Sequence, residues 1–131
     1  MSKRVVVIGG GFAGINLVKY LIKSSDFEVT LVDKNNYNFF PPLLYQVSTG
    51  FLDPSSITFP FRNLFRGRQN FRFRMGELLE VKPELKQIVL DTGKLSYDYL
   101  VMATGTQTNF FGLDQCQRYA IPMKTLEDAL E

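Results

Sequence analysis

The sequence predicts an α/β fold in which a parallel sheet begins with a βαβ unit. Residues 4–8 form a strand pattern in which Arg4 is followed by four apolar, β-branched residues, and it leads directly into the glycine-rich turn GGGFAG. An amphipathic segment and a second strand candidate, residues 27–33, follow, and this strand ends in Asp33. A third apolar run, residues 99–103, ends in Thr104-Gly105. Strand, turn, helix and strand in this order are what a βαβ crossover requires.

The glycines of the turn fit a site for the pyrophosphate of a dinucleotide. Gly9 permits a tight turn, Gly11 lets the main chain approach a phosphate, and Gly14 lets the helix pack closely on the strand. The helix that follows directs its unpaired N–H groups and positive dipole end toward an anion. Asp33, nineteen positions after Gly14, can accept a hydrogen bond from a ribose 2′-OH and would repel a 2′-phosphate. A crossover that uses the glycines only for packing is the alternative, but the complete context favours the nucleotide site.

The first helix and the second strand have the patterns of elements in a covered sheet. Apolar residues of the helix recur at helical spacing, and residues 24–26 end it. Residues 27–33 alternate little between apolar and polar side chains, as expected for a parallel strand covered on both faces.

Residues 37–65 are unusually rich in aromatic residues and prolines. We expect a short helix at residues 43–48, a turn at 49–50 and a further helical stretch at 56–65. Aromatic residues beside a nucleotide site could bury a flat ring system or could simply pack the crossover onto the sheet. Packing is the better interpretation for most of them. The exceptions that we favour are Leu43, Leu44, Tyr45 and Gln46.

The second half of the chain predicts more strands and a closing helix. Residues 71–76 alternate between apolar and charged side chains, and residues 87–90 and 94–97 flank a hairpin turn at 91–93. Residues 99–103 are expected to form a buried parallel strand. Residues 125–131 are expected to begin a helix capped by Thr125, and its short length suggests that the chain is a piece of a longer protein.

Composition excludes several classes of function. Hydrophobic content of 45% and charged content of 21% are ordinary for a globular protein, and no apolar run of 18 residues is present. The N-terminus enters a strand without a signal peptide, which favours the cytoplasm. Cys116 is the single cysteine and histidine is absent, so no disulfide, Ser-His or Cys-His system can form within the chain, and we expect no metal site. Chemistry must therefore come from a bound cofactor.

Basic residues gather in one stretch, without an acidic residue between Asp53 and Glu77. A solvated surface is the favoured interpretation, and an anionic partner such as a membrane surface or a phosphate is the alternative. The net charge of +2 does not suggest binding to nucleic acid. The stretch comprises Arg62, Arg66, Arg68, Arg72 and Arg74.

Four segments together resemble the FAD-binding part of type II NADH dehydrogenases, flavoproteins with two dinucleotide-binding domains. These segments are GGGFAG, the strand ending in Asp33, FFPPLLYQVSTGFLDPSSI and SYDYLVMATGTQTNFFG. The last two are the more specific, because the glycine motif alone marks only the superfamily. The resemblance covers essentially residues 1–131 and implies a Rossmann-like FAD-binding domain with an antiparallel meander inserted at residues 72–97.

The resemblance also implies which residues hold FAD. The pyrophosphate would lie on the glycine turn, the ribose near Asp33 and Lys34, and the adenine against the backbone of Leu78. Residues after the third strand would approach the adenosine diphosphate, and residues 43–46 would lie toward the isoalloxazine ring and its electron acceptor. The remaining implied contacts are Gly9, Gly11, Phe12, Ala13, Gly14, Leu43, Leu44, Gln46, Ala103, Thr104 and Gly105.

The implied activity is transfer of electrons from NADH through FAD to a quinone, with no side chain acting as acid or base. Type II enzymes have a second glycine motif for NADH and a C-terminal membrane segment, and neither is present here. We therefore expect an N-terminal piece, inactive alone, of an enzyme at the cytoplasmic face of a membrane. A sulfide:quinone oxidoreductase and a non-catalytic dinucleotide-binding module are the alternatives, whereas a disulfide reductase would need a cysteine pair in this stretch.

Overall fold

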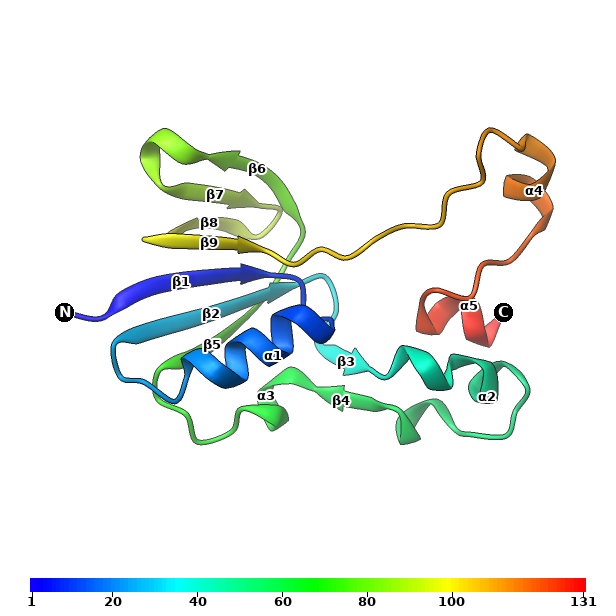
Figure 1. The fold of residues 1–131 in the computed structure, drawn as a ribbon, viewed down its shortest axis with the longest axis horizontal. Coiled ribbons are helices and arrows are strands. Elements are labelled where there is room, and N and C mark those ends of the chain that lie inside the picture. Colours follow the sequence, from blue (N-terminus) through cyan, green and yellow to red (C-terminus); the bar gives the residue numbers. More distant parts are fainter. The chain divides into compact units, whose positions relative to one another are not determined.

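A four-stranded parallel sheet in the order β5-β2-β1-β9 is the central element of the computed structural model, which describes all 131 residues (Figure 1). Its strands are β1 (Lys3–Ile8), β2 (Phe27–Asp33), β5 (Phe71–Met75) and β9 (Tyr99–Met102). Strand β1 is central and pairs with β2 on one side and β9 on the other. All strands are parallel, so their carboxyl ends meet at one edge, the edge where open α/β sheets bind ligands.

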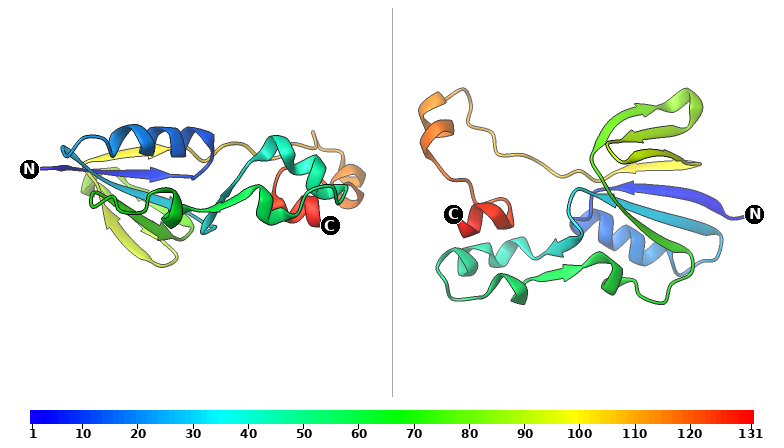
Figure 2. Two further views of the ribbon diagram at one scale, coloured as in Figure 1. Left: turned by 90° about the horizontal axis from the view of Figure 1, so that it is seen from below. Right: turned by 180° about the vertical axis from the view of Figure 1, so that it is seen from behind.

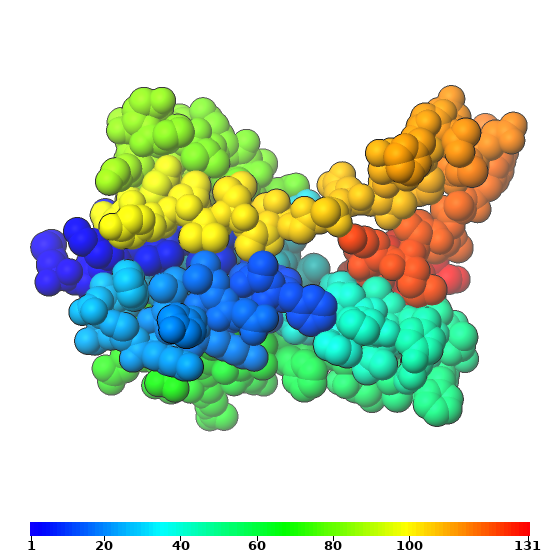
Figure 3. Space-filling model, viewed as in Figure 1, coloured from blue at the N-terminus to red at the C-terminus, as the bar shows by residue number.

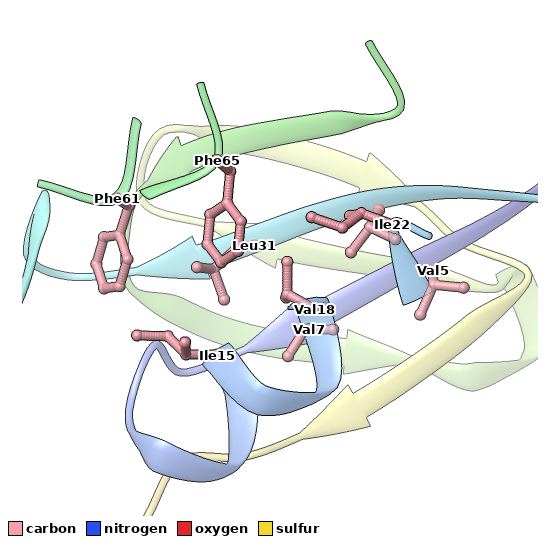
Figure 4. Close-up of a cluster of buried hydrophobic side chains, with 9 residues drawn as sticks. Val5, Val7, Ile15, Val18, Ile22, Leu31, Phe61 and Phe65 are labelled. Carbon is pink, nitrogen blue, oxygen red and sulfur yellow. The ribbon is translucent and has the colours of Figure 1, made fainter. Parts of the chain in front are cut away.

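One face of this sheet is covered by α1 (Phe12–Leu21) and by α3 (Phe61–Leu64) with the residue that follows it. Because successive strand residues point to opposite faces, Val5 and Val7 of β1 face these helices. The helical spacing of Ile15 and Val18 turns the same side of α1 toward them (Figure 4). The buried cluster comprises Val5, Val7, Ile15, Val18, Ile22, Val29, Leu31, Phe61 and Phe65.

The other face is covered by an antiparallel meander in the order β6-β7-β8 (Figure 2, left). Its strands are β6 (Leu78–Lys82), β7 (Gln87–Leu90) and β8 (Gly93–Ser96), and the short 3₁₀ helix η3 (Pro83–Leu85) joins the first two. The second buried cluster comprises Val6, Ile8, Val32, Ile88, Leu90 and Tyr97. Burial on both faces explains why β1 and β2 lack the alternation of a half-exposed strand.

The predicted extent of the meander, residues 72–97, was wrong at its start. Strand β5 pairs in parallel with β2 and belongs to the main sheet. The meander begins only at Leu78, after Gly76 has closed the ladder by donating from its N–H to the carbonyl of Asp33 over 2.9 Å. The alternation seen in residues 71–75 is therefore that of an edge strand in the parallel sheet.

Strand β9 confirms the parallel strand predicted at residues 99–103 but not its burial. It is the last strand of the sheet order, and Tyr99 and Met102 are 56% and 52% exposed. An edge strand leaves one row of backbone groups and part of its side chains open, which accounts for this exposure.

The chain divides into two compact units. Unit 1 comprises Met1–Asn38 and Pro60–Gly105, and so contains the sheet, α1, α3 and the meander. In the space-filling view α1 forms the mid-blue surface over its face of the sheet (Figure 3). Unit 2 comprises Phe39–Phe59 and Thr106–Glu131.

Unit 2 is built from short helices. They are η1 (Pro41–Leu43), α2 (Leu44–Ser48), η2 (Pro54–Ser56), α4 (Asp114–Tyr119) and α5 (Leu126–Leu130). Helix α2 packs against α5, whose N-cap is Thr125 as predicted from the sequence. Thr125 forms a capping box with Asp128. No helix of the chain is both long and apolar enough to cross a membrane.

The helical stretch predicted at residues 56–65 was wrong for most of its length. The chain forms β4 (Thr58–Pro60), which pairs with β3 (Tyr37–Phe39), and only then turns into α3. Thr58 and Phe59 favour extended backbone, and Pro60 restricts the residue before it to the same region. Proline then serves as the N-cap of α3 instead of lying inside a helix.

Candidate dinucleotide site

A cavity of about 330 Å³ opens at the carboxyl edge of the parallel sheet, within unit 1. It lies where β1 and β2 end and where the chain leaves β5 and β9. Five residues that the sequence nominated line it together, namely Gly9, Asp33, Lys34, Leu78 and Thr104. The other lining residues are Ile8, Val32, Asn35, Gly76 and Glu77.

Gly9 and Gly14 have the mechanical roles expected of them. Gly9 has a φ of 102°, and a Cβ there would collide with the carbonyl oxygen of Ala103. A Cβ on Gly14 would collide with the carbonyl oxygen of Gly9, so the first turn of α1 lies directly on the turn out of β1. These contacts, with the 2.8 Å hydrogen bond from the N–H of Ala103 to the carbonyl of Ile8, hold the ends of β1 and β9 together.

Gly11 is different, because it faces open space. A Cβ placed on it would meet no atom within 4 Å, and its φ of −77° is accessible to any residue. Gly11 is the N-cap of α1, whose first turn contains Phe12 and Ala13 and no acidic side chain. The first amide groups of a helix lack intrahelical acceptors, so this end is electrostatically suited to a phosphate.

Asp33 lies beside this glycine loop and already holds part of it. Its Oδ2 accepts a 2.6 Å hydrogen bond from the N–H of Gly10, and its Oδ1 accepts a 2.9 Å hydrogen bond from the N–H of Asn35. A carboxylate has about four acceptor sites, so these bonds leave capacity for a ribose hydroxyl. The carboxylate therefore fixes the loop and still faces the cavity.

Lys34 and Glu77 form an ion pair at the cavity, with 2.8 Å between Nζ and Oε1. The hydrogen bond to Glu77 and its negative charge raise the pKa of Lys34, so the ammonium form is favoured. The backbone of Glu77 is held in turn by Asp91, whose Oδ1 accepts from its N–H over 2.8 Å. The wall formed by residues 76–78 is thereby tied to the meander.

Three of the predicted contact residues belong to unit 2 instead. Leu44 is 2% exposed and packs in the core of that unit, so its side chain offers little surface to a ligand. Leu43 and Gln46 are half-buried, and the backbone carbonyl of Gln46 accepts from the N–H groups of Phe51 and Leu52. Gly105, another predicted contact, belongs to unit 1 as its last residue and has a φ of 69°.

Sequence reasoning missed three residues around the glycine loop. Gly10 is buried, and a Cβ on it would collide with the ring of Phe61. The side chain of Asn38 donates from Nδ2 to the carbonyl of Gly10 over 3.0 Å. Phe61 and Asn38 are distant in sequence from the loop, and no local pattern could have identified them. The middle glycine of GGG was the available signal for Gly10.

The basic stretch does not act as one surface. Arg74 donates from Nη2 to the carbonyl of Thr92 over 2.6 Å and so holds the meander. Arg62 lies 6.0 Å from the ring centroid of Phe73. Arg66 and Arg68 are exposed.

No three acidic, cysteine or histidine side chains are grouped so that they could hold a metal ion.

The fold, a parallel sheet that begins with a βαβ unit and a glycine-rich turn, is Rossmann-like. The model of the pyridine nucleotide-disulphide oxidoreductase family matches residues 3–131, and the chain belongs to this family. It is 39% identical, over 98% of its length, to the type II NADH:quinone oxidoreductase NdhA of Mycobacterium tuberculosis, of which it covers 28%. The resemblance inferred from the four sequence segments is confirmed.

Two solved structures are similar to the chain. The sulfide:quinone oxidoreductase of Aquifex aeolicus has a TM-score of 0.89 at 30% identity, with 98% of this chain and 30% of that chain covered. NDH2 of Plasmodium falciparum in complex with NADH has a TM-score of 0.85 at 31% identity, with 99% of this chain and 28% of that chain covered. The chain thus spans less than a third of the length of each of these relatives.

Proposed function

We propose that this chain is the FAD-binding part of an enzyme that passes electrons from NADH to a quinone. The observation that carries the proposal is the convergence of Gly9, Asp33 and Thr104 on one cavity beside the glycine loop, in a chain similar along its whole length to type II NADH:quinone oxidoreductases. Residues 1–131, both units included, would then form the FAD-binding part.

The residues present fit the adenosine diphosphate half of FAD. The open side of Gly11 and the N-terminus of α1, without an acidic residue in the first turn, suit the pyrophosphate. The remaining acceptor capacity of Asp33 suits a ribose hydroxyl, and Leu78 and Thr104 supply walls of the same cavity. Leu43, Leu44 and Gln46 remain predicted contacts on the isoalloxazine side.

The protein's contribution to the reaction is binding and orientation. When bound, FAD supplies the hydride and electron transfer between NADH and quinone, so no side chain here needs to act as acid or base. Asp33 holds Gly10 in place, Gly9 and Gly14 fix the turn, and the helix end offers N–H donors to the phosphates. These groups are set by the fold before a ligand arrives, which reduces the ordering cost of binding.

We further propose that the enzyme works at the cytoplasmic face of a membrane, because quinone electron carriers dissolve in lipid. The exposed Arg66 and Arg68 have the charge that an anionic lipid surface attracts. Sedimentation of the protein with anionic vesicles, compared with neutral vesicles, tests this part. Equal binding to both vesicle types would argue against a role for these arginines.

The decisive experiment uses the protein expressed from its complete reading frame. We expect a flavin absorption spectrum that bleaches when NADH is added and recovers when a soluble quinone is added. A colourless protein that releases no flavin on denaturation would refute the proposal. A bound dinucleotide that NADH does not reduce would favour a non-catalytic module instead.

Sulfide:quinone oxidoreduction is the second candidate function, favoured by the TM-score of 0.89 to the Aquifex enzyme. This chain offers one exposed cysteine, Cys116. The same preparation distinguishes the two functions, since bleaching of the flavin by sulfide and not by NADH would select the sulfide enzyme.

A further inference from the structure

Gly10 is held on both of its backbone polar groups by side chains from two other segments. Asp33 accepts from the N–H of Gly10 over 2.6 Å, and Asn38 donates to the carbonyl of Gly10 over 3.0 Å. The Phe61 ring fills the space where a Cβ of Gly10 would lie. Phe61 is 1% exposed and lies 5.0 Å from the ring of Phe73, centroid to centroid, so it cannot easily move away.

The bond from Asn38 determines where the next amide points. The structure contains no cis peptide bonds, and in a trans peptide the C=O and the following N–H point in opposite directions. The carbonyl of Gly10 is turned toward Asn38, so the N–H of Gly11 is turned away from it. Around Gly11 itself, a Cβ built on the backbone would meet no protein atom within 4 Å, so a ligand can approach this residue.

The other two hydrogen bonds of the loop act on different peptide units and do not fix this orientation. Asp33 acts on the N–H of Gly10, which belongs to the preceding peptide unit. The first intrahelical hydrogen bond, from the N–H of Ile15 to the carbonyl of Gly11 at 3.0 Å, acts on the following unit. Glycine on both sides leaves the peptide between them free to rotate unless a side chain holds it.

We propose that Asn38 is a positioning residue for phosphate binding: its amide locks the Gly10–Gly11 peptide so that the Gly11 N–H is presented to the pyrophosphate of the dinucleotide. The inference rests on the proposed function only in that a dinucleotide binds here. It assigns to Asn38 a role in the affinity for phosphate groups and not in the affinity for adenosine.

The test compares ADP, which carries the pyrophosphate, with adenosine, which lacks it, on the cofactor-free protein. In Asn38→Asp a carboxylate replaces the amide donor and faces the Gly10 carbonyl. We expect ADP affinity to fall about tenfold or more, while adenosine affinity and the thermal midpoint of the free protein change little. Asn38→His keeps a ring N–H at the same number of bonds from Cα and should recover part of the ADP affinity.

Asn36→Asp is the matched control, because it adds the same charge at an exposed asparagine two residues earlier. It should leave ADP affinity within about twofold of the original value. If Asn38→Asp does not fold, Asn38→Leu, which removes the donor without adding charge, replaces it in the same comparison.

Two results would overturn the inference. One is an equal loss of ADP and adenosine affinity, which would mean that Asn38 supports the whole pocket. The other is unchanged ADP affinity. ADP is common to FAD and NAD, so the comparison of ADP with adenosine tests the role of Asn38 even if the protein binds no flavin. A failure of the proposed function is therefore distinguishable from a failure of the inference about Asn38.

Discussion

At the scale of single residues, Gly11 and Gly14 of the same motif have separable roles. Gly14 is buried where α1 meets the turn out of β1, and the obstacle to a side chain there is the backbone of Gly9. Gly11 has no such obstacle and an ordinary φ of −77°. Gly14 is therefore a packing residue and Gly11 a ligand-approach residue, although both belong to one fingerprint.

We predict that Gly14→Ala lowers the free energy of unfolding by about 2–3 kcal/mol, because a methyl group is forced against immobile backbone. Gly11→Ala should cost about 0.5 kcal/mol, since alanine is only a poorer N-cap than glycine. It should nevertheless weaken ADP binding by at least about tenfold, because the methyl group occupies the approach of the phosphate. Denaturant unfolding and calorimetric titration with ADP measure the two quantities.

Each variant is the control for the other. A stable Gly14→Ala protein would show that the close contact is not required. A Gly11→Ala protein that binds ADP normally would contradict the placement of the pyrophosphate at this loop.

The sequence could identify the residues of the site that act locally, and not those that act across the fold. The roles of Gly9 and Gly14 follow from the turn and helix in which they occur, so the spacing of the motif was sufficient to predict them. Asn38 reaches the loop only because the chain after β2 returns past it, and the 3.0 Å bond to Gly10 depends on that path. Tertiary contacts of this kind leave no periodic trace in a single sequence.

At the scale of elements, β1 and the segment before β9 are joined by reciprocal bonds between Arg4 and Asp98. Oδ2 of Asp98 accepts from the N–H of Arg4 over 2.7 Å, and the N–H of Asp98 donates to the carbonyl of Arg4 over 2.8 Å. The guanidinium and carboxylate also approach to 3.4 Å. The hydrogen bond from the backbone N–H of Arg4, followed by that from its side chain, lowers the pKa of Asp98.

This pKa predicts a pH dependence of stability with a definite sign. A carboxyl whose pKa in the folded state lies below its ordinary value of 3.8 stabilises the fold at pH values above 3.8. This contribution is lost as the pH falls through the folded-state pKa. We expect Asp98→Asn to be less stable than the original protein near pH 6, and the difference to shrink below about pH 4. Urea unfolding at several pH values measures it.

Glu28→Gln is a suitable comparison, because Glu28 is an exposed acid in the same sheet. A difference between Asp98→Asn and the original protein that stayed constant from neutral to acid pH would show that charge at Asp98 contributes nothing.

The predicted elements were right where one pattern dominated and wrong where two competed. Residues 27–33 became β2 with the expected limits, because Val29, Leu31 and Val32 are buried and valine and threonine favour extended backbone. Residues 56–65 contain apolar positions compatible with a helix, but Pro60 divides them into a strand and a single helical turn. The pairing of β5 with β2 could not be read from alternation, which describes one strand and not its partner.

At the scale of the molecule, the two compact units differ in how their cores are built. Unit 1 has a sheet covered on both faces by two buried clusters. The buried apolar residues of unit 2 are few, and all except Ile57 lie on short helices. They are Leu44, Val47, Ile57, Leu126 and Ala129. Short helices depend on packing for their stability, and a small core supplies little of it.

We therefore predict that the units open with different free energies. Amide groups of β1 and β2, paired along their whole length inside unit 1, should exchange with deuterium only on global unfolding. Those of α2 and α5 should exchange faster by local opening, and Thr125→Ala, which removes the N-cap of α5, should accelerate exchange in α5 while leaving β1 unchanged. Hydrogen exchange followed by mass spectrometry of peptides resolves both segments. Equal protection of α5 and β1, or acceleration in both by the cap variant, would mean that the units unfold as one, since a shared transition exposes all amides together.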